Sequence, residues 1–410
     1  MALFGGTHDP ASAFPLREAD QCVLCGMCSA YCPTYLKNRE EGESPRGRIA
    51  ILIALASNSL TPSPRMRAHI AHCLVCRACE RSCPSGVPYG RIIDAGRALL
   101  AERVGTPLVE RLLLHGLIAQ PDRLQRLAGL LYKLQRSGLI RLAPLLGLRR
   151  LARLLPPLHA PLPFQPHYPA RGVERGRVAL FTGCITKLLD RTTLEASLHV
   201  LTHLGFSVDV PPEQGCCGAL HLHAGDPVGA EPLLQQNAAT FAKPEWLAIL
   251  TMASGCGVTL AESLHAQHGD HRVMDISDFL ARSPWPKEIT VRPLHKRVAV
   301  HDPCSLVNGL RKPEGPYQLL RRIPGLMVLP LPENNQCCGG AGAALLTHSD
   351  LTEALQSDKI DALREIAPDI LVTSNLGCAL HLTQGTQQAG ISLEIIHPIT
   401  LLARQLAFES

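Results

Sequence analysis

The chain has 410 residues, 46% of them apolar, and a formal net charge of +5. This composition excludes global disorder, and the length predicts two or three domains. The small basic excess gives no reason to expect a nucleic-acid partner. Sixteen cysteines in a long chain without a secretory signal argue against a disulfide framework. The longest apolar stretch near the start, residues 49–56, is too short to span a bilayer, so we expect a cytoplasmic protein, soluble or peripheral.

Two runs of cysteines before residue 90 share the pattern C-x-x-C-x-x-C-x-x-x-C-P. This pattern is typical of ferredoxins with two [4Fe–4S] clusters, in which three cysteines wrap one cube and the fourth ligates the other. Zinc also binds C-x-x-C pairs, but it explains neither the third cysteine nor the trailing Cys-Pro. We therefore expect a ferredoxin-type domain over residues 1–106. Its predicted ligands are Cys22, Cys25, Cys28 and Cys83 for the first cluster, and Cys73, Cys76, Cys79 and Cys32 for the second.

Four arginines lie close to these runs in the sequence: Arg46, Arg48, Arg77 and Arg81. A positive charge there can stabilise an anionic cluster or bind a partner. For each arginine taken singly, a solvated surface position is the simpler expectation.

A cysteine-free region follows over residues 107–171. Leucines recur at helical spacing, with prolines that break the pattern into short helices. Between Arg111 and Arg153 the only acidic residue is Asp122. Such basic amphipathic helices can lie on an anionic membrane, which makes a membrane-anchoring or assembly role one hypothesis. Packing against a neighbouring domain or a partner is the other interpretation.

The remainder of the chain is an internal duplication, expected as one repeat over residues 172–290 and another over 291–410. Each copy contains a lone cysteine, then Cys-Cys-Gly, then a second lone cysteine, and the flanking residues match as well. Matching spacing and flanks indicate a repeated structural unit.

Within each copy, short β-branched runs alternate with helical segments. Runs at 178–181, 208–210 and 249–252 predict buried strands, and segments such as 188–204 predict helices between them. The alternation indicates α/β units with cysteines at strand ends and helix starts. The expected fold class is multidomain α+β: a mostly helical ferredoxin-type domain followed by a duplicated α/β Cys-Cys-Gly domain.

Four cysteines in each copy match the number of thiolates that one cluster needs, so the repeats are candidates for a further cluster or metal. Zinc and free thiols remain alternatives. The candidate ligands are Cys184, Cys216, Cys217 and Cys256 in the first copy, and Cys304, Cys337, Cys338 and Cys378 in the second. Because a neutral imidazole can bind metal or relay protons, we assign possible auxiliary roles to His223, His301 and His381. No residue is assigned a catalytic role.

Together these motifs resemble the iron–sulfur subunits of bacterial glycolate oxidases, over nearly the whole chain. Relatives with Cys-Cys-Gly domains act in lactate utilisation, anaerobic glycerol-3-phosphate oxidation and heterodisulfide reduction. The resemblance implies that an FAD-binding partner subunit oxidises a 2-hydroxy acid, with a second flavoprotein-like subunit in the complex, and that this chain carries electrons towards the quinone pool. The motifs that carry it include CVLCGMCSAYCPTY, GESPRGRI, CLVCRACERSCPSGVPYG, CCGGAGAALLTHSDL and NLGCALHL.

Two departures from the relatives narrow this expectation. Neither Cys256 nor Cys378 is followed by the second cysteine of a C-x-x-C, which argues against the five-thiolate clusters of heterodisulfide reductases. Where glycolate subunits tend to read His-Cys-Pro-Cys, this chain has Asp302 in place of the first cysteine. Alternatives are the equivalent subunit of a lactate or glycerol-3-phosphate dehydrogenase, and a disulfide or quinone reductase acting at the Cys-Cys-Gly site.

Overall fold

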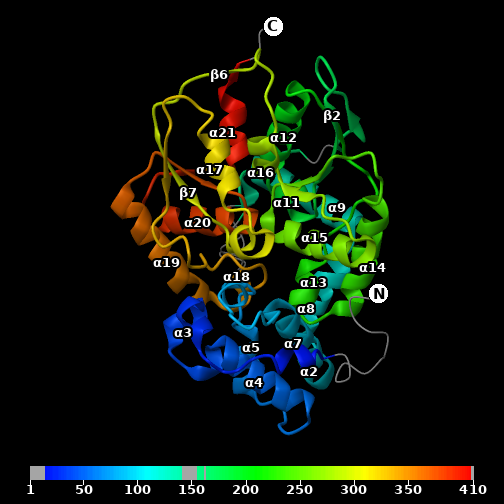
Figure 1. Ribbon diagram of the computed structural model, residues 1–410, viewed down its shortest axis with the longest axis vertical. Coiled ribbons are helices and arrows are strands. Elements are labelled where there is room, and N and C mark those ends of the chain that lie inside the picture. Colours follow the sequence, from blue (N-terminus) through cyan, green and yellow to red (C-terminus); the bar gives the residue numbers. More distant parts are fainter. Residues whose placement is uncertain (1–13, 141–154, 161–162, 408–410) are drawn as a thin grey trace.

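The computed structural model describes residues 14–140, 155–160 and 163–407. Figure 1 shows the N-terminal domain, which we call the head, at one end of the long axis, with the two repeats above it. The head is helical, as expected. Its elements are α2 Leu16–Ala19, η1 Met27–Tyr31, α3 Pro33–Asn38, η2 Glu41–Glu43, α4 Pro45–Ala56, α5 Pro64–Ala71, α6 Ala78–Arg81 and α7 Tyr89–Val104.

Local signals start the head helices, and apolar packing holds them together. Ser44 and Ser63 cap α4 and α5 through their side chains, and a proline follows each cap at the first helical position. Helices α4 and α7 then pack through a buried core that includes Leu52 and Ile92. They approach so closely that a Cβ on Gly96 would lie 2.4 Å from the Leu52 methyl carbons.

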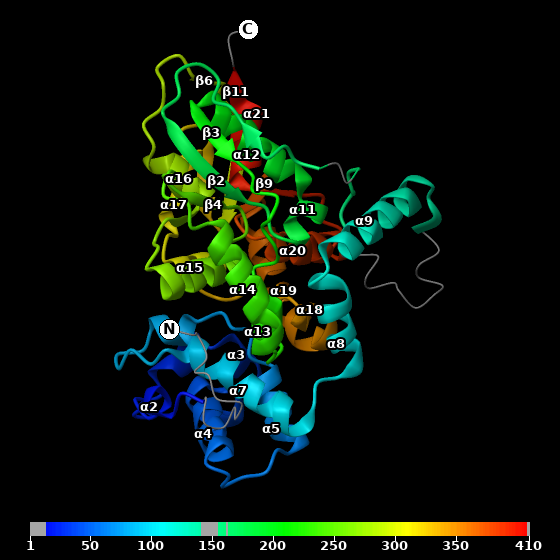
Figure 2. The same cartoon turned by 90° about the vertical axis from the view of Figure 1, so that its right-hand side faces the viewer.

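A helical connection leads from the head to the repeats. It consists of α8 Leu108–Leu113, the π-helical turn η3 Leu114–Ile118 and α9 Pro121–Arg136. Figure 2 shows α8 rising from the head and α9 beside the repeats. Leucine spacing thus predicted helices correctly here, whereas the basic residues at 141–154 lie outside the described part of the chain. None of the described helices has the length and apolar character that crossing a bilayer requires.

The first repeat is built on a five-stranded sheet in the order β1-β3-β2-β4-β5. All neighbours are parallel except β1, which runs antiparallel to β3. The strands are β1 His167–Tyr168, β2 Gly176–Phe181, β3 Phe206–Asp209, β4 Ile249–Thr251 and β5 Val273–Asp275. Its helices are α11 Ile185–Leu189, α12 Arg191–His203, α13 Ala219–His223, α14 Pro227–Thr240, α15 Ser254–His268 and α16 Ile276–Arg282.

The second repeat has a four-stranded parallel sheet in the order β10-β9-β7-β8, which matches β5-β4-β2-β3 of the first. The strands are β7 Arg297–His301, β8 Met327–Pro330, β9 Ile370–Thr373 and β10 Glu394–Ile396. The helical elements are η5 Ser305–Leu310, α17 Glu314–Leu320, α18 Ala344–Thr347, α19 Ser349–Ile366, α20 Leu376–Gln388 and α21 Pro398–Gln405. The sheet topology therefore confirms the duplication.

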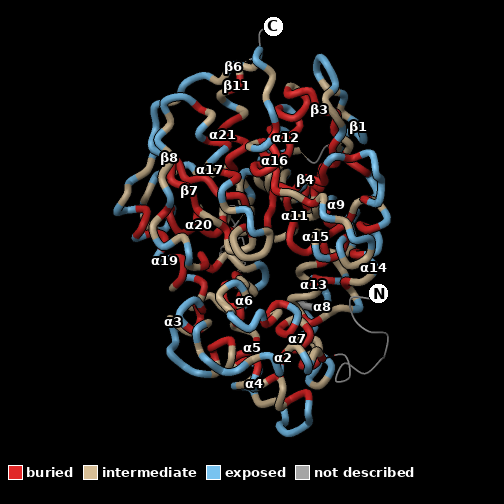
Figure 3. Tube along the Cα trace, in the orientation of Figure 1, coloured by how far each residue is buried: buried red, intermediate tan, exposed pale blue. Residues whose placement is uncertain are grey.

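The two repeats share one hydrophobic core, visible as the buried region between the sheets in Figure 3. Val178 and Leu180 of β2 join Val298 and Val300 of β7 in that core. A two-stranded sheet of β6 Thr290–Val291 and β11 Leu406–Ala407 joins the start of the second copy to its end. The repeats thus pack as one body and hold their cysteine sites in a fixed arrangement.

Candidate metal centres

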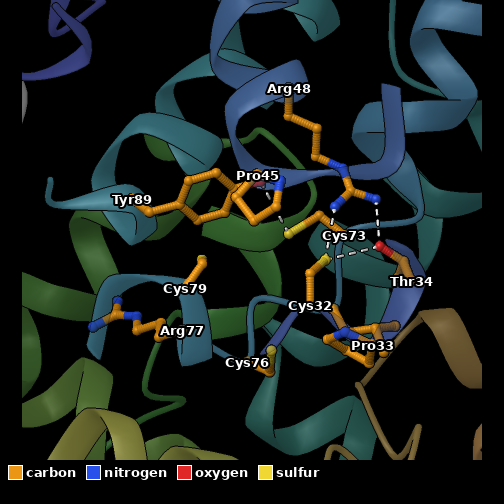
Figure 4. Close-up of a pocket in the computed structure, with 11 residues that line it drawn as sticks. Cys32, Pro33, Thr34, Pro45, Arg48, Cys73, Cys76, Arg77, Cys79 and Tyr89 are labelled. Atoms are coloured by element: carbon orange, nitrogen blue, oxygen red, sulfur yellow. Dashed lines mark hydrogen bonds between the residues drawn. The ribbon is translucent and has the colours of Figure 1, made fainter. Parts of the chain in front are cut away.

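Four of the predicted ligands line one cavity in the head: Cys32, Cys73, Cys76 and Cys79 (Figure 4). Cys32 immediately precedes α3, and the other three surround the turn between α5 and α6. Burial raises the pKa of the Cys76 and Cys79 thiols, and neighbouring thiols add to the effect. A metal that binds here must therefore displace thiol protons. The soft, exclusively thiol donor set fits an iron–sulfur cluster.

Arg48 lies beside this cavity, with only 1% of its surface exposed. Its Nη1 lies 3.7 Å from Cys32 Sγ, and its Nη2 donates to the Glu43 carboxylate at 2.6 Å and to the Thr34 hydroxyl at 2.8 Å. The Tyr89 hydroxyl similarly lies 3.7 Å from Cys73 Sγ and donates towards it. The expected solvated position is wrong for Arg48. The signal was helical spacing, because Arg48 shares the buried face of α4 with Leu52 and Leu55.

Glu43 completes this buried charge network. Although burial acts to raise its pKa, hydrogen bonds from His72 and His69 and the charge of Arg48 hold the pKa of this carboxyl below its usual range. Both imidazoles contact Glu43 Oε1 through Nδ1 at 2.8 Å. Arg48 thus places a fixed positive charge beside the thiol of Cys32, and the buried carboxylate of Glu43 that pairs with it is itself compensated by hydrogen bonds.

The first cysteine loop of the head has positive φ angles at the same two positions as the second. Leu24 and Val75 have φ values of 56° and 50°, and Gly26 and Arg77 have φ values of 80° and 57°. Cys22, Cys28 and Cys83 are half-buried against the head core, whereas Cys25 is exposed. A side chain at Gly26 would collide with the Arg46 guanidinium, which donates to the Leu24 carbonyl at 2.9 Å.

In the first repeat the structure gathers all four predicted cysteines. Cys184 follows β2, Cys256 lies in the first turn of α15, and Cys216 and Cys217 precede α13. Gly218 makes the turn after the pair with φ 84°, which an L side chain rarely adopts. Cys184 Sγ and Cys216 Sγ are 3.3 Å apart, and Cys217 contacts the thiols of Cys216 and Cys256. Hydrogen bonds from the thiols of Cys184 and Cys217 lower the pKa of Cys216.

The second repeat gathers its four cysteines in the same order. Cys304 Sγ and Cys337 Sγ are 3.9 Å apart, and Cys338 contacts the thiols of Cys337 and Cys378. A ring nitrogen of His301 lies within 4.8 Å of the thiols of Cys338 and Cys378. Burial lowers the pKa of His301 to about 3, so its imidazole is neutral and able to bind a metal.

The other predicted histidines have different surroundings. His223 Nδ1 lies 3.0 Å from Asp94 Oδ1 and joins the first repeat to α7 of the head. Both ring nitrogens of His381 are hydrogen-bonded, one to the Thr352 carbonyl and the other to Gln356. The sequence analysis named Arg48 beside the cysteine runs but favoured a solvated position for it, and it assigned no role to His221, which is fully buried beside the first Cys-Cys pair.

The second loop of the head lies against the repeats. Leu74 packs with Cys337 and Leu355, and Cys76 and Cys304 border the same small cluster. Asn308, the fourth residue of η5, donates from Nδ2 to the Cys76 carbonyl at 2.8 Å. Arg77 pairs with Glu262 of α15 and is therefore not the solvated residue expected from the sequence. The second loop is consequently covered, while the first faces outward.

Two family descriptions match the chain. A 4Fe-4S dicluster domain covers residues 18–87, and a cysteine-rich domain covers residues 178–261 and 298–383.

Several curated proteins are similar to it. The glycolate oxidase iron-sulfur subunit of Escherichia coli is 35% identical over 386 residues, 89% of this chain and 91% of that protein. The probable glycolate oxidase iron-sulfur subunit of Bacillus subtilis is 31% identical over 414 residues, 94% of this chain and 93% of that protein. Lactate utilization protein A of Geobacillus kaustophilus is 26% identical over 232 residues, 54% of this chain and 96% of that protein.

Proposed function

Since the chain belongs to the family of glycolate oxidase iron–sulfur subunits, we propose that it takes electrons from an FAD-binding partner that oxidises glycolate and passes them towards the quinone pool. Its own part in the complex is iron–sulfur electron transfer. The proposed complex contains a second flavoprotein-like subunit and works in the cytoplasm. Substrate oxidation takes place on the flavin subunit, so no residue of this chain contacts glycolate.

The observation that carries the proposal is the convergence of four thiols on one cavity in the head. We assign Cys73, Cys76, Cys79 and Cys32 to one [4Fe–4S] cluster, and Cys22, Cys25, Cys28 and Cys83 to the other. A bound cluster supplies a one-electron redox couple. The chain supplies what surrounds it: Arg48 and Tyr89 direct donor groups at ligand sulfurs, which stabilises the added negative charge of the reduced state.

We place the flavin-bearing partner over the first cysteine loop. In the twin loop Leu74 is buried under the second repeat, whereas the first loop leaves Val23, Leu24 and Met27 exposed by 70%, 55% and 57%. These side chains surround the exposed Cys25, so a partner that buries them also comes close to the first cluster. Such a contact suits electron entry, because the apolar surface that the partner buries lies next to Cys25, a proposed ligand of the first cluster.

We further propose that the Cys-Cys-Gly sites bind metal. The support is that each set of four cysteines forms a continuous series of contacting thiols. A disulfide or quinone reductase acting at these sites is the competing function. It requires that Cys217→Ser or Cys338→Ser abolishes turnover while the cluster signals of the head remain.

A peripheral membrane contact is a second proposal, carried by α8, whose Leu108, Val109 and Leu112 are exposed by 70%, 70% and 61%. The basic helix α9 behaves differently, because its buried residues Leu124 and Ala128 face the protein. Salt-dependent binding to anionic liposomes that is lost on substituting the three α8 residues by Ser supports the contact. Absence of binding by the whole complex contradicts it.

The function is tested with anaerobically purified complex. Glycolate added in the presence of the flavin subunit should produce the EPR signals of reduced four-iron clusters. Chemical analysis should find about eight irons per chain for the two head clusters, and more if the Cys-Cys-Gly sites also bind iron. If lactate or glycerol 3-phosphate reduces the clusters and glycolate does not, the substrate assignment is wrong. If zinc is found without acid-labile sulfide, the cluster assignment is wrong.

A further inference from the structure

The two Cys-Cys-Gly sites differ at the position three residues before the first cysteine. In the second repeat this is His301, whose ring nitrogen lies near Cys338 and Cys378. In the first repeat it is Phe181, which packs with Cys217 in an apolar cluster that Cys256 borders. Both residues end the equivalent strand of their sheets, β7 and β2. The duplicated fold therefore presents an imidazole to one set of thiols and a phenyl ring to the other.

A second difference lies on the helix that covers each site. Lys359 of α19 is fully buried, donates to the Glu333 carbonyl, and interacts electrostatically with the thiols of Cys338 and Cys337. The corresponding stretch of α14 carries the neutral Asn237, which donates to the Cys216 carbonyl at 2.7 Å. A buried ammonium group is expensive unless an anion balances it, and thiolates bound to a metal are such an anion.

We propose that the second repeat holds an iron–sulfur centre whose ligands are cysteine thiolates together with the imidazole of His301, and that the first repeat does not form an equivalent centre. The donors are the imidazole of His301 and the thiolates of Cys304, Cys337, Cys338 and Cys378. His301 Nδ1 lies 3.0 Å from the Thr373 hydroxyl, which leaves Nε2 for the metal and fixes the ring.

The spread of the donors favours iron over zinc. A structural zinc site takes four ligands in a tetrahedron, whereas only three of the five donors, His301, Cys338 and Cys378, form a group in which all atoms lie within 4.8 Å of one another, and Cys337 and Cys304 extend the series of contacting thiols beyond it. A cluster with several irons has room for all of them. An imidazole in the place of a fifth thiolate leaves an iron–sulfur centre less negative and raises its reduction potential, and the charge of Lys359 acts in the same direction. The second repeat is thus built to accept an electron more readily than an all-thiolate site.

The position of this centre indicates its redox neighbour. Cys304 and Cys76 border one cluster of packed side chains, and Asn308 ties η5 to the Cys76 carbonyl. The centre of the second repeat therefore lies next to the second cluster of the head. This inference rests on the proposed function, because it takes the head to hold its two clusters.

The test uses the anaerobically purified full chain and pulsed EPR after reduction by dithionite and after oxidation by ferricyanide. The wild type should contain more than the roughly eight irons of the head, and one paramagnetic state should show nitrogen hyperfine coupling from a histidine ligand. His301→Phe, which copies the first repeat, should lose this coupling and the additional iron but keep the head signals. His301→Cys should keep the iron and lose the coupling, which guards against a folding defect. Phe181→His is the matched control and should leave the coupling unchanged.

The proposal and the function on which it rests fail in different ways. Absence of nitrogen coupling from the wild type in both redox states, or its persistence in His301→Phe, overturns the proposed centre while the head signals stand. Zinc in place of the additional iron also overturns it. Loss of the head signals from the wild type instead overturns the function itself.

Discussion

Replacing Arg48 by Met tests how this chain tunes its second cluster. The guanidinium is 1% exposed and forms an ion pair with Glu43 at 2.6 Å, where the Glu43 side chain is 2% exposed. Removing it leaves Glu43 buried with only its two histidine partners. Breaking a buried pair in this way typically destabilises a protein by about 3–5 kcal/mol. We therefore expect a clear loss of stability in the head together with a change in redox behaviour.

The redox effect follows from the distance of 3.7 Å between Arg48 Nη1 and Cys32 Sγ. Two unit charges at that separation interact by about 4.5 kcal/mol at an effective dielectric constant of about 20. The electron added on reduction is spread over the cluster, so roughly 2 kcal/mol remains. For a one-electron couple this corresponds to a decrease in reduction potential on the order of 100 mV.

The assay is an EPR-monitored redox titration of anaerobically reconstituted protein. Arg48→Met should lower one of the two head potentials, and Arg48→Lys, which keeps the charge, should lower it by less than half as much. Arg46→Met is the control, because Arg46 is tied to the first loop through the Leu24 carbonyl and should leave the second potential unchanged. Unaltered potentials in an Arg48→Met protein with both clusters assembled would refute the reasoning.

Three further predictions concern docking, packing and pH. Met27→Lys should weaken binding of the flavin subunit by about tenfold or more in calorimetry, whereas Leu60→Lys, at an exposed site 48% accessible and distant in sequence from the loop, should not. Gly96→Ala should destabilise the head by about 1–3 kcal/mol in denaturant unfolding because of its close helix contact, while Gly116→Ala, with open space around its Cβ, should be neutral or stabilising. Burial lowers the pKa of His397 to about 3, so the unfolded state binds more protons below its ordinary pKa. The free energy of unfolding should therefore fall as pH drops from about 6.5 towards 3. The fall should be steeper than in His397→Asn, which lacks this titrating side chain, by up to about 1.4 kcal/mol per pH unit.

Local sequence features predicted much of the fold and of the candidate site. The strands at 178–181, 208–210 and 249–252 appear within two residues of β2, β3 and β4. The lone cysteines of the repeats, Cys184, Cys256, Cys304 and Cys378, lie at or within the start of a helix, as the alternation of patterns indicated, whereas Cys337 and Cys338 lie in the loop between β8 and α18. These features were predictable because hydrophobic periodicity and ligand spacing act over only a few residues.

The environment of each site was not predictable in the same way. Arg48 was expected in solvent and is buried, because α4 places it on the face that packs into the head. His381 was assigned a possible role in metal binding or proton relay, and the structure shows that its two ring nitrogens are hydrogen-bonded to Thr352 and Gln356. His301 lies near the thiols of Cys338 and Cys378, which come from two other segments of the second repeat. Each of these outcomes depends on partners far away in the sequence.

The amino-acid sequence by itself determined that this protein has two ferredoxin-type cysteine runs and a duplicated α/β unit, since both are written in short-range spacing and repetition. Only the tertiary structure decided that the second cysteine loop of the head is covered by the second repeat, whereas the first loop remains exposed. It also decided that His301 and Lys359 lie beside the thiols of one repeat, whereas in the other Phe181 packs with Cys217 and Asn237 donates to the Cys216 carbonyl. The physical reason is that burial and charge compensation arise from packing between distant segments, which no local pattern records.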